Sequence, residues 1–159
     1  MENRKLEIDY QVARFEELAD GDRELVCRAM QATANSYARY SHFCVGAAVR
    51  LDDGTIVSGA NQENAAFPSG LCAERTAVFA AQAQYPEHKI TTLAIAASNG
   101  RGFVADPIVP CGACRQVILE VEDRYKSPVR MMLYGTRAVY IFHSISDLLP
   151  FSFVGDSMR

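Results

Sequence analysis

The sequence lacks the long apolar runs that targeting signals and membrane-spanning helices require. No stretch of its 159 residues approaches the ~18 apolar residues of a membrane helix, and Met1–Lys5 leads into no apolar core of signal-peptide length. We therefore expect a cytoplasmic protein that does not contact a membrane.

A strong charge of either sign is also missing. The net charge of −3 provides no general attraction to nucleic acid or to an anionic membrane surface. There is no internal repeat and no low-complexity segment. The five cysteines form an odd set, which fits reduced thiols or metal ligands better than a disulfide framework. A chain of this length suits one domain with a full apolar core.

Hydrophobic spacing predicts strands and helices that alternate along the chain. Helices are expected over 22–37, 71–84 and 111–125, with a short one over 144–149. Strands are expected over 44–51, 55–60, 90–97, 129–134 and 138–142, with a flexible loop over 98–102. Because the first two of these strands flank the turn signal Asp52-Asp53-Gly54, they should form a hairpin. This order predicts an α/β fold in which helices cover a mixed sheet.

Two cysteine motifs carry the chemistry of the chain. The first is Cys72-Ala73-Glu74, and the second is Pro110-Cys111-Gly112-Ala113-Cys114. Each falls where a helix is expected to begin, and a helix N-terminus favours the thiolate form that binds metal. Three such ligands can hold one zinc ion with its fourth position open, where bound water becomes a nucleophile. The motifs therefore indicate a hydrolytic enzyme.

Two other interpretations of these cysteines are open at this point. A closed, purely structural zinc site needs a fourth ligand, for which Cys27, Cys44 or one of the three histidines is available. A redox dithiol at Cys111 and Cys114 suits a thioredoxin-like turn but leaves Cys72 and Glu74 unexplained. Cys27 and Cys44 fit core positions better than ligand positions.

Further segments give the chain a specific family resemblance. A Cys-x-Glu element followed by Pro-Cys-x-x-Cys is typical of zinc deaminases. The whole set resembles the cytidine deaminases of the small, homotetrameric type, in the family's order over roughly residues 22–155. The matching segments are 40–48, 61–65, 72–77, 110–116 and 148–150 with Phe153.

The resemblance implies a three-layer α/β/α fold with a mixed five-stranded sheet. It implies Cys72, Cys111 and Cys114 as Zn²⁺ ligands, Glu74 as the proton shuttle and Arg75 as a hydrogen-bond donor to the ligand thiolates. Three thiolates and one Zn²⁺ sum to −1, so such a cation balances charge, and Arg115 is a second candidate for this task. The reaction implied is hydrolytic deamination of cytidine and deoxycytidine to uridine and deoxyuridine, with release of ammonia in pyrimidine salvage.

The same resemblance assigns substrate contacts. It implies Asn61 and Glu63 as partners of the ribose, Phe43 against the base and the backbone of Ala73 at the pyrimidine. Phe153 corresponds to an aromatic that a neighbouring subunit supplies, so we expect a homotetramer. The family often has tyrosine where this chain has Phe67. Deamination of another small cytosine compound, a polynucleotide-editing activity and a non-enzymatic zinc module are the alternatives.

The chain is expected to divide into two parts. Residues 1–21 are charged and mixed, with a short strand around 5–12 or a loosely packed arm. Residues 22–159 form the expected cytidine deaminase-like catalytic domain.

Overall fold

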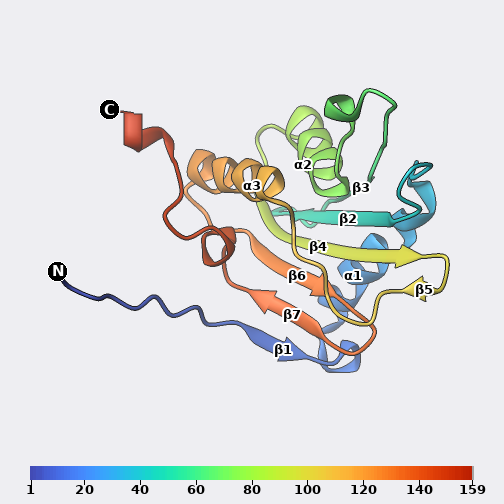
Figure 1. Ribbon diagram of the computed structural model, residues 1–159, viewed down its shortest axis with the longest axis horizontal. Helices are drawn as coiled ribbons and strands as arrows, with labels where there is room; N and C mark the ends of the chain where they lie inside the picture. Colours follow the sequence, from blue (N-terminus) through green and yellow to red (C-terminus); the bar gives the residue numbers. More distant parts are fainter. Residues whose placement is uncertain (159) are drawn as a thin grey trace.

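A mixed sheet of seven strands forms the centre of the molecule, and the computed structural model describes residues 1–158 (Figure 1). The strand order is β1-β7-β6-β4-β2-β3, with β5 paired to β4. Only β4 and β6 run parallel. The strands are β1 (Gln11–Ala13), β2 (Cys44–Leu51), β3 (Ile56–Ala60), β4 (Ile90–Asn99), β5 (Gly102–Phe103), β6 (Arg130–Tyr134) and β7 (Val139–Phe142).

Helices cover both faces of this sheet, which confirms the predicted three-layer α/β/α fold. Helices α2 (Ala73–Gln84) and α3 (Gly112–Tyr125) lie side by side on one face, and α1 (Asp20–Ala32) lies on the other (Figure 1). Alternation along β2 divides the core, because successive side chains of a strand point to opposite faces. Ala47 and Val49 belong to the hydrophobic core between the sheet and helices α2 and α3, whereas Ala48 belongs to the core between the sheet and α1.

A close approach between α2 and β3 determines where the first cysteine motif lies. Gly59 of β3 faces the backbone of α2, and a Cβ atom built there would lie 2.4 Å from the Ala77 nitrogen. Only glycine permits this contact. The start of α2 is therefore held close to the end of β3, which leads directly to Asn61.

A carboxylate on α3 secures the other helix of this layer. Glu122 accepts hydrogen bonds from the backbone nitrogens of Val129 (2.7 Å) and Ile145 (3.0 Å), and from the hydroxyl of Ser144 (2.8 Å). These contacts tie α3 to the chain before β6 and to the segment after β7. The orientation of α3, and with it the start of the helix, depends on them.

The differences from the sequence-based prediction lie at element ends and edges. The predicted five-stranded sheet leaves out β1 and β5, which join the sheet at its periphery. The short strand expected around 5–12, as the alternative to a loosely packed arm, is observed as β1 over Gln11–Ala13 only. The stretch expected as a loop over 98–102 instead forms a tight β4–β5 hairpin, in which Gly102 adopts φ +110°. The first helix begins at Asp20 and ends at Ala32, followed by a 3-10 turn. Within residues 1–158, no helix is both long and apolar enough to span a bilayer.

Candidate functional site

The N-terminal ends of α2 and α3 bring the two cysteine motifs together. Cys72 directly precedes α2, and Cys111 directly precedes α3. Cys114 lies in the first turn of α3 and is fully buried, whereas Cys111 is exposed. Both helices direct the positive ends of their dipoles at the sulfurs, which stabilises thiolates there.

The spacing of the three sulfurs fits one tetrahedral zinc ion. The Sγ atoms of Cys72, Cys111 and Cys114 all lie within 4.8 Å of one another, and those of Cys72 and Cys111 are 3.8 Å apart. Zn–S bonds of about 2.3 Å place two sulfurs of a tetrahedron roughly 3.8 Å apart. Among the described residues, no fourth ligand joins this group, and Cys27 and Cys44 lie outside it. This open set argues against a closed structural site.

The three thiols interact strongly with one another. A hydrogen bond from Cys114, with a further one from Arg75, lowers the pKa of Cys72 to about 5. The same contact to Cys72, together with burial, raises the pKa of Cys114 well above its usual range. The pair thus shares a proton that a divalent cation would displace, because metal binding favours thiolates. A redox dithiol of Cys111 and Cys114 alone does not account for the contact with Cys72.

Two charged side chains from the first turn of α2 flank the sulfurs. Glu74 is only 5% exposed, and burial raises the pKa of its carboxyl, with a further contribution from the charge on Cys72. A raised pKa suits a group that must both accept and release protons. Arg75 donates from Nη2 to Cys72 Sγ at 3.7 Å. The first turn of α2 therefore places an acid–base group and a charge-balancing cation beside the cluster.

A cavity of about 570 Å³ opens next to Cys72 and contains the residues expected to hold the sugar. Asn61, Glu63, Cys72 and Arg75 all line it. Backbone hydrogen bonds make this arrangement: Gln62 donates to Leu71 O (2.8 Å), and Leu71 donates back to Gln62 O (2.9 Å). The segment that carries Asn61 and Glu63 is thereby paired with the residue directly before Cys72.

The polar side chains of this cavity also organise its wall. The Glu63 carboxylate accepts from the Tyr40 nitrogen at 2.7 Å, from the Ser41 nitrogen and from the Ser41 hydroxyl. The Ser41 and Tyr40 contacts lower the pKa of Glu63, so its carboxylate stays ionised. Asn61 accepts from the Val45 nitrogen (2.8 Å) and donates to Phe43 O (2.9 Å). Asn61 and Glu63 therefore hold the 40–45 segment against the cavity.

The sequence-based prediction placed Phe67 near the sugar or a subunit interface but missed that Tyr40 and Ser41 line the cavity. Tyr40, Ser41 and Phe67 line the cavity, and the rings of Tyr40 and Phe67 pack edge to face at 5.8 Å. The signal was present, because Tyr40 and Ser41 open the matching segment 40–48. Phe43 is half-buried beside the cavity and is not among its lining residues.

Two further residues of the sequence-based prediction, Arg115 and Phe153, lie away from the sulfurs and the cavity. Arg115 donates to Pro110 O (2.8 Å) and Leu148 O (2.7 Å), so it braces the turn before Cys111 and does not contact the sulfurs. The expectation that Arg115 also balances the thiolates is therefore not supported. Phe153 lies outside its own chain's cavity and is 60% exposed, on a segment held by Gln116.

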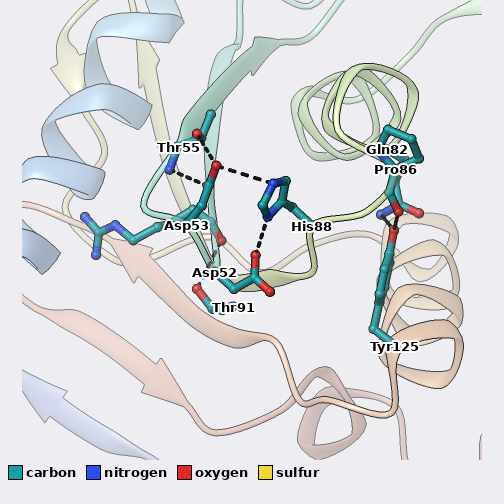
Figure 2. A network of polar contacts seen from close by, with 9 residues as sticks. Asp52, Asp53, Thr55, Gln82, Pro86, His88, Thr91 and Tyr125 are labelled. Atoms are coloured by element: carbon teal, nitrogen blue, oxygen red, sulfur yellow. Dashed lines mark hydrogen bonds and ion pairs between the residues drawn. The ribbon is translucent and has the colours of Figure 1, made fainter.

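A second group of potential ligands lies away from the cysteines, at the far end of α2. Figure 2 shows the His88 ring between two carboxylates, with Nδ1 2.8 Å from Asp52 and Nε2 3.6 Å from Asp53. The hydrogen bond to Asp52 raises the pKa of His88. Because both ring nitrogens face carboxylates, this arrangement favours the protonated ring, whereas a metal ligand needs a free nitrogen lone pair. This cluster clamps the β2–β3 turn to the α2–β4 connection.

Together, the α/β/α fold, the three-sulfur cluster and the buried glutamate beside it define a zinc-binding deaminase domain. The family model described as "Cytidine and deoxycytidylate deaminase zinc-binding region" matches residues 20–127, about two thirds of the chain. The chain belongs to this family. This family binds zinc, and the group of Cys72, Cys111 and Cys114 is consistent with zinc.

Individual relatives agree with this assignment. A cytidine deaminase of Halalkalibacterium halodurans is 36% identical over 139 residues, which cover 87% of this chain and 98% of the relative. A cytidine deaminase of Mycobacterium tuberculosis is 39% identical over 133 residues, or 82% of this chain and 87% of the relative. The crystal structure of cytidine deaminase from Burkholderia pseudomallei superposes with a TM-score of 0.70 at 36% identity, covering 82% of this chain and 97% of that one.

Proposed function

We propose that this protein is a cytidine deaminase, which hydrolyses cytidine and deoxycytidine to uridine and deoxyuridine and releases ammonia. The observation that carries the proposal is the three-sulfur cluster beside the buried Glu74, one sulfur of which, that of Cys72, belongs to the cavity that Asn61 and Glu63 also line. When bound by Cys72, Cys111 and Cys114, Zn²⁺ supplies an activated water as the nucleophile.

Glu74 carries the protons of this reaction. Its carboxylate takes a proton from the attacking water and delivers it to N3 of the cytosine ring. It later protonates the amino group that leaves C4. Burial supports this role, because a carboxyl whose pKa is raised toward the working pH both accepts and releases protons readily. The backbone of Ala73, one residue before, lies at the same helix start for contact with the pyrimidine.

Asn61 and Glu63 orient the sugar, and Phe43 packs on the base. The ionised Glu63 would accept from a ribose hydroxyl in place of the Ser41 hydroxyl, from which it accepts in the structure. A carboxylate that loses this hydrogen bond when the hydroxyl is missing would discriminate against a substrate that lacks the hydroxyl. The cavity lining contains no lysine, and Arg75, its one arginine, faces Cys72. This environment favours an uncharged nucleoside over a phosphorylated one.

Glu74→Gln is the direct test. The substitution keeps the size of the side chain and removes proton transfer, so kcat should fall by roughly 10²–10⁴. Zinc content, measured by metal analysis, should stay near one per chain. Glu120→Gln on the exposed side of α3 is the matched control and should retain full activity. Loss of cytidine absorbance at the wild-type rate in the Glu74 variant would refute the assignment.

The assembly is proposed to be a homotetramer in which Phe153 completes a neighbour's site. The support is its position, exposed and outside the cavity of its own chain. Mixing Phe153→Ala with Glu74→Gln tests this, because a mixed assembly contains sites with an intact Glu74 and a partner's intact Phe153. Recovery of activity on mixing is expected, and its failure would contradict a role for Phe153 across subunits. We further propose a cytoplasmic location, since five free thiols suit a reducing compartment.

A further inference from the structure

An extended segment before the catalytic domain has the pattern of a strand. From residue 6 to residue 10 every second side chain is apolar, and Leu6, Ile8 and Tyr10 are 57%, 43% and 51% exposed. The segment extends away from the body of the molecule (Figure 1). It also lies outside the family match, which begins at residue 20.

The sheet sets the direction of this arm, defined here as residues 3–9. Strand β1 pairs with β7 through Gln11↔Ile141, and the Tyr10 ring stacks on Phe142 with centroids 5.2 Å apart. Because β7 ends at Phe142, the arm, which precedes β1, extends beyond the end of β7 and has no neighbouring strand there. Within residues 1–158, no strand pairs with the arm. Its backbone donors and acceptors are thus available to another strand.

The charges of the arm select one register for pairing with a second copy of itself. Antiparallel pairing centred on Leu6 places Leu6 opposite Leu6 and Lys5 opposite Glu7 on both sides. Centring on Glu7 also gives two attractive pairs, Lys5 with Asp9, but it places two glutamates opposite each other at the centre, which the Leu6 register avoids. Centring on Ile8 places Glu7 opposite Asp9 on both sides. Like charges directly opposite destabilise a ladder, and opposite charges stabilise it.

The remaining registers are less favourable because of like charges or mismatched polarity. Centring on Lys5 or Arg4 places two cations opposite each other, and registers centred between residues place Leu6 opposite a polar or charged side chain. The Leu6 register pairs Leu6 with itself and places an apolar side chain opposite a charge only at Ile8, which faces Arg4. The arm of one molecule is therefore complementary to the arm of another about a two-fold axis at Leu6.

We propose that the arms of two copies of this protein pair as antiparallel strands over residues 3–9, centred on Leu6. The ladder would be roughly 23 Å long, at about 3.3 Å per residue, so the two catalytic domains lie at its opposite ends. Isolated two-stranded ribbons are only marginally stable. We therefore expect a weak, reversible association that is sensitive to the arm's charges and does not depend on the proposed activity.

Cross-linking through a single introduced cysteine tests the register. In Leu6→Cys, the two new thiols face each other, within the Cα separation of 4.4–6.8 Å that disulfides need. Oxidised glutathione should then give a covalent dimer of the zinc-loaded protein on a denaturing gel. Ile8→Cys is the matched control, because the same register separates its two thiols by roughly 13 Å. The wild-type protein, treated in the same way, shows how much cross-linking its own five cysteines produce.

Charge reversal in the Leu6→Cys background distinguishes pairing between chains from contacts within one. Lys5→Glu and Glu7→Lys each turn two attractive pairs into two repulsive ones, so each alone should lower the dimer yield about tenfold or more. An equal mixture of the two variants restores opposite charges only between different chains, and the yield should recover in that mixture. Equal cross-linking of Leu6→Cys and Ile8→Cys, or no recovery on mixing, would overturn the proposal.

Discussion

Replacing Arg75 with alanine should reduce turnover far more than it reduces zinc binding. The Arg75 guanidinium lies 3.7 Å from Cys72 Sγ, and two unit charges at that distance interact by about 4.5 kcal/mol at an effective dielectric of ~20. Three thiolates and one divalent cation share a net charge of −1, so roughly a third of a charge resides on each sulfur. The Cys72 contact is then worth about 1.5 kcal/mol.

Arg75 interacts with the Cys114 thiolate as well, which brings the total to about 3 kcal/mol. Structural zinc sites bind the metal by ~10–16 kcal/mol, so a loss of about 3 kcal/mol leaves roughly 7–13 kcal/mol, which keeps the site loaded when free zinc is supplied at tens of micromolar. The uncompensated negative charge, in contrast, opposes deprotonation of the nucleophile. Each 1.4 kcal/mol is a factor of ten in rate, so we expect kcat to fall roughly 10- to 100-fold.

The assay pairs the loss of cytidine absorbance with metal analysis of the same sample. Arg137→Ala is the matched control, because it removes a cation whose partner is the exposed Asp106, away from the cluster. The reasoning would be refuted by an Arg75→Ala enzyme whose kcat and pH–rate profile match the wild type. Loss of zinc in proportion to activity would also refute it, since the metal would then depend on Arg75 directly.

Three further substitutions test the clamp, the bracing of α3 and the sugar contact. The raised pKa of His88 means that its clamp stabilises the fold below about pH 6.5 and that this stability is lost as pH rises through the folded-state pKa. His88→Gln should therefore lower the urea midpoint at pH 6 and have little effect at pH 9, and an equal effect at both would contradict the charged clamp. Glu122→Ala leaves two backbone nitrogens and a hydroxyl without their acceptor, so the free energy of unfolding should fall by about 3–5 kcal/mol in urea denaturation. Glu120→Ala, on the exposed side of the same helix, should lie within ~0.5 kcal/mol of wild type. Glu63→Gln should raise KM for cytidine about 10- to 100-fold. Ser41→Ala removes one hydrogen bond to Glu63 and keeps the carboxylate, so it should raise KM for cytidine much less. Equal increases in KM for the two variants would mean that Glu63 only holds the 40–45 segment and does not contact the sugar.

Periodicity located the core elements well because the central strands and helices have strong one-sided or continuous apolar patterns. Helices α2 and α3 and strands β2 and β4 lie within about two residues of their predicted bounds. The peripheral strands were less predictable. β1 is a three-residue strand that exists through its pairing with β7, and β5 depends on the turn at Gly102. Local sequence carries little information about such pairings, since the partner strand is distant in the chain.

The sequence by itself determined the chemistry of this protein. The spacing Cys-x-Glu, followed by Pro-Cys-x-x-Cys at a second helix start, specifies three soft ligands and one carboxylate, because a helix holds such neighbours at its N-terminus. The tertiary structure decided how these groups act. Burial of Glu74, the direction of Arg75 toward Cys72 and of Arg115 away from it, and the pairing of Gln62 with Leu71 all result from packing between distant segments. A pKa, a cavity and a charge balance depend on distances through space, and no local pattern of residues contains them.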